Sequence, residues 1–230
     1  MPLTVRSAIL GLALALPLAG ASGEARVDVD IQLLLAIDSS ASVNFQEFRL
    51  QVMGTAGALR DPEIIEAIEL WAPNGIAVSV VQWSGRRQQL VAVNWTRVGD
   101  AASIGALADR IENMGRTWVG ETAIGDMLTF ALDHLERGPY EGARKIIDVS
   151  GDGKSNAGAQ PAALRTAAAS ADISINGLAI LNEDLTLDLY YEDEVIGGPG
   201  AFVITAQDYE AFATAMRKKL LKEIRGAPLG

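Results

Sequence analysis

The sequence predicts a three-layer, doubly wound α/β fold: a mostly parallel sheet of about six strands with one antiparallel edge strand and helices on both faces. Three observations support this. Short apolar runs alternate with longer segments of helical periodicity. The apolar runs are continuous, which is typical of strands buried on both faces. Finally, one pair of runs is joined by a turn too short for a crossover helix, so that pair must be antiparallel.

The first strand is expected over 31–38, after a polar lead-in at 24–30, and it ends abruptly at Asp38. Ser42 is placed to cap a helix over about 44–59. Helical spacing puts four side chains of that helix on its inner face: Phe45, Phe48, Val52 and Ala56. Pro62 can begin a short second helix over 63–70.

The remaining elements follow the same alternation. Strands at 76–83 and 89–95 form the antiparallel pair, with the second at a sheet edge. A polar excursion at 183–200 carries the acidic run 192–194, which is most often a solvated face. Further helices are expected at 100–114, 122–135, 160–170 and from about 207, and further strands at 145–150, 173–180 and 201–205.

Residues 1–21 have the pattern of a cleaved export signal. Arg6 precedes an apolar core at 8–18, and the small residues 19–21 fit a cleavage site. The apolar core is well short of the roughly 20 residues that a membrane-spanning helix needs. We therefore expect a single domain over 22–230, with no stable membrane insertion after signal cleavage.

The composition narrows the classes of function. The 230 residues are 49% hydrophobic and 21% charged, which is typical of a globular protein. The net charge of −10 argues against nucleic acid or an anionic lipid surface as a partner. The absence of cysteine excludes disulfides and thiolate metal sites, and in an exported protein it fits a bacterial periplasm.

Three loops carry oxygen-bearing side chains at the ends of predicted elements. They are Asp38-Ser39-Ser40-Ala41-Ser42, Gly120-Glu121-Thr122 and Ser150-Gly151-Asp152-Gly153. Open α/β sheets place their ligands at the carboxyl ends of strands. Carboxylates and hydroxyls suit Mg²⁺, Mn²⁺ or Ca²⁺ rather than softer metals. Each loop alone also fits an ordinary turn or helix cap.

Taken together and in this order, the loops resemble the von Willebrand factor type A (vWA) domain over about residues 29–225. The metal-ion-dependent adhesion site of that family uses an Asp-x-Ser-x-Ser loop, a distant Thr and a further Asp. The resemblance assigns these roles to Asp38, Ser40, Ser42, Thr122 and Asp152. It implies that the two serines bind the ion directly, that Thr122 and Asp152 bind it directly or through water, and that a partner's acidic side chain completes the shell.

Two features qualify the resemblance. Thr117 is a second threonine near the expected position, but its surroundings match the family less well. Glu121 stands beside Thr122 where small residues are common, so it either adds negative charge near the ion or points to solvent. The runs 148–153 and 190–203 also resemble an exported bacterial subgroup, domain of unknown function 1194, whose biochemical role is not settled.

Other chemistries fit less well. Gly153-Lys154-Ser155 ends like a phosphate-binding loop, but Asp148 occupies the position of its first glycine, so no nucleotide is expected. The lone histidine, His134, is expected to be a surface or packing residue. No Gly-x-Ser-x-Gly nucleophile motif is present.

The sequence thus favours an exported, non-enzymatic vWA-type module that binds a divalent cation and, through it, a protein partner. Mg²⁺ is the expected ion, with Mn²⁺ and Ca²⁺ as alternatives. A second hypothesis is an assembly or maturation factor for an envelope enzyme or complex. A metal-dependent hydrolase is less favoured, because only Glu121 or Asp126 could act as its base.

Overall fold

The computed structural model describes residues 25–226, so the expected export signal at 1–21 lies outside the described residues. Within them a six-stranded sheet has the order β3-β2-β1-β4-β5-β6. Neighbouring strands are parallel except for β3, which runs antiparallel to β2 at one edge. The strands are β1 (Val27–Asp38), β2 (Ile76–Trp83), β3 (Gln89–Val98), β4 (Tyr140–Gly151), β5 (Ile173–Ile180) and β6 (Val203–Ala206). The predicted fold class is confirmed.

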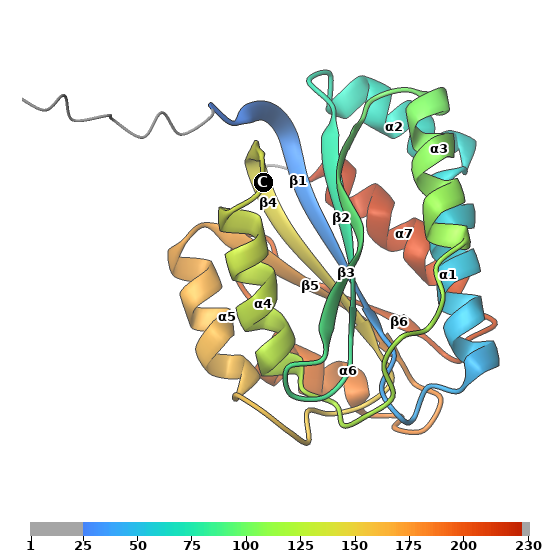
Figure 1. The fold of residues 1–230 in the computed structure, drawn as a ribbon, viewed down its shortest axis with the longest axis vertical. Helices are drawn as coiled ribbons and strands as arrows, with labels where there is room; N and C mark the ends of the chain where they lie inside the picture. The colour runs from blue at the N-terminus through green and yellow to red at the C-terminus, as the bar shows by residue number, and fades with distance from the viewer. Residues whose placement is uncertain (1–24, 227–230) are drawn as a thin grey trace, which may run out of the picture.

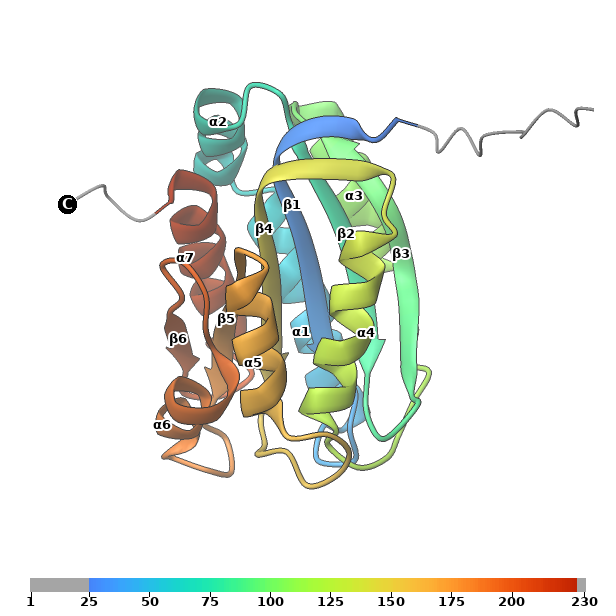
Figure 2. The same cartoon turned by 90° about the vertical axis from the view of Figure 1, so that its left-hand side faces the viewer.

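Helices cover both faces of the sheet, as Figures 1 and 2 show. One face carries α1 (Phe45–Leu59), α2 (Pro62–Trp71), α3 (Ala101–Glu112) and α7 (Phe212–Arg225). The other carries α4 (Ile124–Glu136), α5 (Pro161–Ser170) and the short α6 (Leu187–Tyr190), which continues into a π-helical turn (Tyr191–Val195). None of the helices within residues 25–226 combines the length and the apolarity needed to cross a bilayer.

The central strand β1 explains why its sequence is a continuous apolar run. Ile31, Leu33 and Leu35 belong to the hydrophobic core under α1 and α7. Leu34 and Ala36 belong to the separate core under α4 and α5. Because successive side chains of a strand point to opposite faces, a strand covered on both faces needs apolar residues at every position.

Several predicted boundaries were wrong at polar ends of elements. β1 starts at Val27 rather than 31, and β4 starts at Tyr140 rather than 145, because the two ends pair with each other in register. β3 continues to Val98 rather than 95. The first residues of β1 and β4 are mostly exposed or half-buried, so their sequences lack the apolar runs used to predict strands.

The starts of three helices also differ from prediction. Asn44, not Ser42, caps α1: its side chain accepts from Gln46 N and Glu47 N, while Phe45 is 68% exposed rather than inward. α4 begins at Ile124, so Thr122 lies in the preceding loop. α7 begins at Phe212, five residues after the predicted start near 207. Because Asn44 caps α1 and α4 begins only at Ile124, the predicted site residues Ser42 and Thr122 are neither part of a helix nor its cap.

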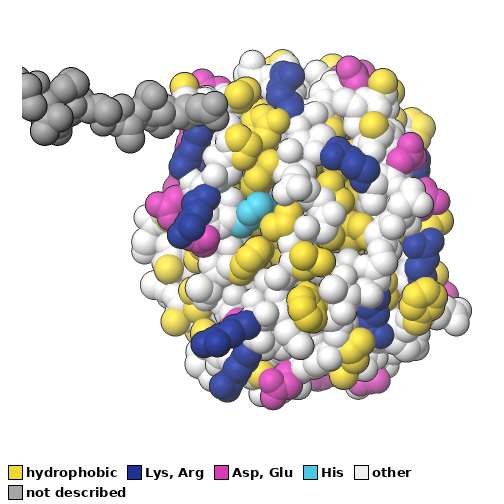
Figure 3. Space-filling model, in the orientation of Figure 1, with side chains coloured by type: hydrophobic (Ala, Val, Ile, Leu, Met, Phe, Trp, Pro, Cys, Tyr) yellow, Lys and Arg dark blue, Asp and Glu magenta, His cyan; other side chains and the backbone are white. Residues whose placement is uncertain are grey.

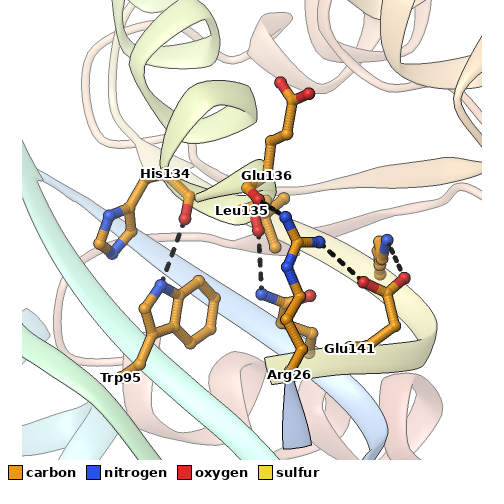
Figure 4. A network of polar contacts seen from close by, with 8 residues as sticks. Arg26, Trp95, His134, Leu135, Glu136 and Glu141 are labelled. Atoms are coloured by element: carbon orange, nitrogen blue, oxygen red, sulfur yellow. Dashed lines mark hydrogen bonds and ion pairs between the residues drawn. The ribbon is translucent and has the colours of Figure 1, made fainter. Parts of the chain in front are cut away.

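His134 is a packing residue, as predicted. Its ring stacks on that of Trp95, with the centroids 5.2 Å apart, and its Nε2 lies 3.0 Å from Ser79 Oγ. Burial lowers the pKa of His134, so the ring is neutral near pH 7. In Figure 3 the histidine (cyan) lies among hydrophobic side chains on the side of the molecule that is turned to the viewer. In Figure 4, Trp95 donates to the His134 carbonyl, and Arg26 joins Glu141 at the same end of the sheet.

Candidate metal centre

The three predicted loops meet at the carboxyl end of β1 and β4. The two strands are adjacent, with Ile37 opposite Ser150, so the loops after them start side by side. Ala41 N donates to Gly120 O over 2.8 Å, which joins the serine loop to the loop before α4. Residues that lie far apart in the sequence therefore share one edge of the sheet, as parallel topology predicts.

The serine loop is ordered by its own aspartate. Ser40 N donates to Asp38 Oδ1 over 2.7 Å, which closes a tight turn directly after the strand. This turn brings Ser40 Oγ to 3.2 Å from Ser42 Oγ. Asp38 and Ser40 are fully buried, whereas Ser42 is exposed. The loop thus has two buried residues, Asp38 and Ser40, and one residue, Ser42, that is open to solvent.

Asp152 is hydrogen-bonded through both carboxylate oxygens. Ser42 Oγ donates to Oδ1 over 2.7 Å, and Tyr209 Oη donates to Oδ2 over 2.8 Å. Burial and the nearby charges of Asp152 and Asp38 raise the pKa of Tyr209, so its phenol stays protonated as a donor. Sequence reasoning missed Tyr209, because an isolated tyrosine before the last helix carries no motif.

Thr122 is held by its backbone. Its N–H donates to Asn156 Oδ1 over 2.8 Å, and Asn156 N donates back to Thr122 O over 2.9 Å. The Thr122 side chain lies near the loop after Asp152: a Cβ placed on Gly153 would be 3.9 Å from Thr122 Oγ1. Asn156 was also missed, since only the folded loop brings it to Thr122.

The other threonine and the flanking charges occupy different positions. Thr117 is exposed, and its N–H donates to Gln82 Oε1 rather than to the predicted site. Glu121 is exposed to solvent. Arg116 is a third residue that the sequence did not reveal: its Nη2 donates to Ser39 O and Ser40 O over 3.0 and 2.7 Å. This guanidinium places positive charge against the carbonyls of the serine loop.

The pKa of the Asp38 carboxyl is strongly shifted. Burial, followed by the charge of Asp152, raises the pKa of Asp38 from 3.8 to about 7, although the Ser40 hydrogen bonds and Arg116 oppose the rise. Its Oδ2 is buried and has no hydrogen-bond partner among residues 25–226. A buried carboxylate oxygen without a donor is unfavourable, and a nearby cation would relieve that cost.

Gly151 keeps the space beside this oxygen open. A Cβ at Gly151 would lie 2.9 Å from Asp38 Oδ2, 2.9 Å from Tyr191 Oη and 3.4 Å from Trp83 Cζ2. In the described range, Tyr191 Oη and Trp83 Nε1 are likewise buried without hydrogen-bond partners. A side chain at position 151 would therefore press on the Asp38 carboxylate and the Tyr191 hydroxyl, which favours glycine here.

The donor set decides which ions fit. No group of three or more His, Cys, Asp or Glu side chains in the described part of the chain could hold a metal ion. The predicted residues instead combine two carboxylates with three hydroxyls, all hard oxygen donors. Such a set suits Mg²⁺, Mn²⁺ or Ca²⁺, with water or an outside oxygen filling the remaining positions.

Two residues of the segment that resembles the end of a phosphate-binding loop form ion pairs in the structure. Asp148, at the position of the first glycine of such a motif, is buried and pairs with Lys219 at 2.7 Å. Lys154 pairs with Asp184 at 2.9 Å. The two residues that would have to meet a nucleotide phosphate therefore take part in ion pairs within the protein.

Solved structures with the same fold include the proximal thread matrix protein 1 from the mussel byssus. It is 18% identical with a TM-score of 0.61, over 87% of this chain and 49% of that chain. Another structure of that protein, described as having a zinc-occupied MIDAS motif, gives a TM-score of 0.60 with 18% identity over the same shares of the two chains. This chain therefore spans about half the length of the mussel protein.

A von Willebrand factor type A structure from Catenulispora acidiphila has a TM-score of 0.55 and 18% identity, over 85% of this chain and 42% of that chain. Identities this low establish the fold alone. No curated protein matches the chain. The model of the family described as Protein of unknown function (DUF1194) matches residues 28–228. This chain, with its vWA fold, therefore belongs to the DUF1194 family.

Proposed function

We propose that this protein is an exported binding module that holds a divalent cation at Asp38, Ser40, Ser42, Thr122 and Asp152, and recognises an acidic group of a protein partner through that ion. One observation carries the proposal. Asp38 Oδ2 is buried without a hydrogen-bond partner in the described range, while Asp38 Oδ1 accepts from Ser40 N, and the Ser40 hydroxyl lies 3.2 Å from that of the exposed Ser42. A cation would compensate the buried charge, and the exposed side would leave it accessible.

Each residue would contribute a distinct part of the site. Ser40 and Ser42 would bind the ion directly, and Thr122 and Asp152 directly or through water. The ion would supply the positive charge that attracts an outside carboxylate, since the protein itself has a net charge of −10. The zinc-occupied MIDAS motif of the mussel protein supports a metal centre in this fold, but does not select the ion here.

The surroundings of Asp126 and Glu121, the two candidate general bases, favour a binding role over hydrolysis. Asp126 Oδ1 accepts a hydrogen bond from Ala159 N over 2.8 Å, so it serves the loop before α5. Glu121 is exposed to bulk water. A general base must reach the proton that it abstracts, and within residues 25–226 neither carboxylate is hydrogen-bonded to the hydroxyl of Ser40, Ser42 or Thr122. We therefore propose a non-enzymatic role.

Export is proposed from the signal-like pattern at 1–21, and it would place the module in the periplasm or outside the cell. An assembly or maturation factor for an envelope enzyme is the second candidate, because a metal-dependent protein contact would serve either role. The genes encoded beside this one separate the two: a neighbouring oxidoreductase or ATPase favours maturation, and surface components favour adhesion.

Calorimetry tests the metal site. Mg²⁺ and Mn²⁺ are titrated into the chain lacking residues 1–21, and into its Asp38→Ala and Asp28→Ala variants. Asp28 is an exposed aspartate on the same strand, so it controls for the loss of one negative charge. Binding should persist in Asp28→Ala and disappear in Asp38→Ala; equal binding by all three proteins would rule out the proposed centre.

A capture experiment tests the partner. The immobilised chain is exposed to envelope extract with Mg²⁺ or, as a metal-free control, with a chelator. The Asp38→Ala variant with Mg²⁺ is the second control. A protein retained only by the metal-loaded wild type is the expected result. Retention that ignores both the chelator and the mutation would contradict recognition through the ion.

A further inference from the structure

Tyr209 stands out because it contacts the predicted site without belonging to any of its three loops. It lies between β6 and α7, and it belongs to the hydrophobic core that also holds residues of α1 and α7. Its side chain is 3% exposed, and its hydroxyl donates to Asp152 Oδ2 over 2.8 Å. A tyrosine from the C-terminal part of the chain is thus fixed against one oxygen of a predicted metal ligand.

The hydrogen bond limits what Asp152 can offer to an ion. Oδ2 is directed to Tyr209, whereas Oδ1 faces the serine loop through Ser42. Asp152 is 2% exposed, so water does not compete with Tyr209 for Oδ2, and turning the carboxylate to present both oxygens to an ion would break this hydrogen bond. At most one oxygen of Asp152 is available to an ion beside Ser42.

Ca²⁺ and Mg²⁺, which would compete for such a site, differ in how many oxygens of one carboxylate they use. Ca²⁺ takes six to eight oxygen ligands and often uses one carboxylate through both oxygens. Mg²⁺ requires near-octahedral geometry, usually with one or two carboxylates and several waters. A carboxylate restricted to one oxygen, in a site rich in hydroxyls, therefore suits the smaller six-coordinate ion.

We propose that Tyr209 is a specificity-determining positioning residue: by holding Asp152 Oδ2 out of the coordination shell, it makes the centre favour Mg²⁺ or Mn²⁺ over Ca²⁺. This rests on the proposed function, and it adds the feature that selects among the three ions. The phenol acts through Asp152 and does not itself bind the ion.

The test compares two ions in three proteins. Dissociation constants for Mg²⁺ and Ca²⁺ are measured by calorimetry on the wild type, Tyr209→Phe and Tyr140→Phe, with circular dichroism to check folding. Tyr140 begins β4, at the opposite end of the strand from Asp152, so its variant controls for the loss of a tyrosine hydroxyl. The readout is the ratio of the Ca²⁺ to the Mg²⁺ dissociation constant.

In Tyr209→Phe the ratio should fall by about tenfold, the lower end of the effect that outer hydrogen-bond partners have on metal affinity. The freed oxygen lets Asp152 bind Ca²⁺ through both oxygens. Tyr140→Phe should keep the wild-type ratio. A Tyr209→Phe protein that loses affinity for both ions equally, with an unchanged ratio, would mean that the tyrosine only stabilises the fold.

Two outcomes keep the inference separate from the proposed function. If the wild type binds neither ion, the metal centre itself is wrong. If the wild type binds Ca²⁺ more tightly than Mg²⁺, the centre stands but the role of Tyr209 is refuted, whether or not the variant folds.

Discussion

Replacing Asp38 with asparagine should remove a pH dependence of stability that the wild type has in the absence of divalent ions. The pKa of Asp38 is raised from 3.8 to about 7, first by burial and then by the charge of Asp152. Since this pKa is higher in the folded than in the unfolded state, the folded state binds the proton more tightly. The resulting stabilisation is complete below about pH 4 and is lost as the pH rises through about 7.

The size of the effect follows from the two pKa values. A gap of about three pH units, from 3.8 to about 7, corresponds to about 4 kcal/mol at most. Roughly 2–3 kcal/mol of this falls between pH 5 and pH 8. Asparagine does not titrate, but it keeps an Oδ1 atom to accept from Ser40 N, so the turn after β1 is retained.

Urea unfolding with a chelator, at pH 5 and pH 8, measures the change in free energy of unfolding for each protein. The wild type should lose roughly 2–3 kcal/mol more than Asp38→Asn over this range. Taking the difference between the proteins cancels other groups, such as Asp148, whose pKa burial also raises to about 7. Equal losses would refute the assignment of a protonated, buried Asp38.

Added Mg²⁺ completes the experiment. At one hundred times the dissociation constant, a bound ion stabilises the folded state by about 2.7 kcal/mol. This gain should be present in the wild type at pH 8, smaller at pH 5, where a proton competes for Asp38, and absent in Asp38→Asn. A stabilisation of both proteins by Mg²⁺ would place the ion elsewhere.

Three further substitutions test other contacts. Gly151→Ala should destabilise the protein by about 1–3 kcal/mol in urea unfolding, because the new Cβ would lie 2.9 Å from Asp38 Oδ2. Gly105 on α3 has open space around it, so Gly105→Ala should be neutral or stabilising. Similar costs for both variants would show that the loss does not come from crowding of Asp38. Asn156→Ala should weaken Mg²⁺ binding about 10–100-fold in calorimetry, because Thr122 loses its clamp, whereas the exposed Asn94→Ala should not. Lys219→Met should cost about 3–5 kcal/mol in thermal or urea unfolding, because it leaves Asp148 and Glu223 buried without their shared cation. The exposed Lys218→Met is its control, and an equal, small effect of both would contradict a role for the buried ammonium.

The sequence by itself determined the fold class, and its resemblance to the vWA pattern predicted the five residues of the candidate centre. The strands and the first site loop depend on local patterns: an apolar run marks a strand covered on both faces, and an Asp-x-Ser-x-Ser turn is encoded within a few residues. Thr122 and Asp152 were assigned through the family resemblance instead. Local patterns missed the polar ends of β1 and β4, because their pairing depends on each other rather than on their own pattern. The cap on Asn44 was a local signal that the prediction overlooked, because Glu47 follows Asn44 by three residues, as in a capping box.

Only the tertiary structure decided how the centre is built. The hydrogen bond from Ser42 to Asp152 joins residues 110 positions apart, and that from Tyr209 to Asp152 joins residues 57 apart. These contacts exist because β1 and β4 are neighbours in the sheet, and because the segment before α7 returns to the same edge. Strand order and chain return are properties of the whole packed core, so residue spacing cannot specify them.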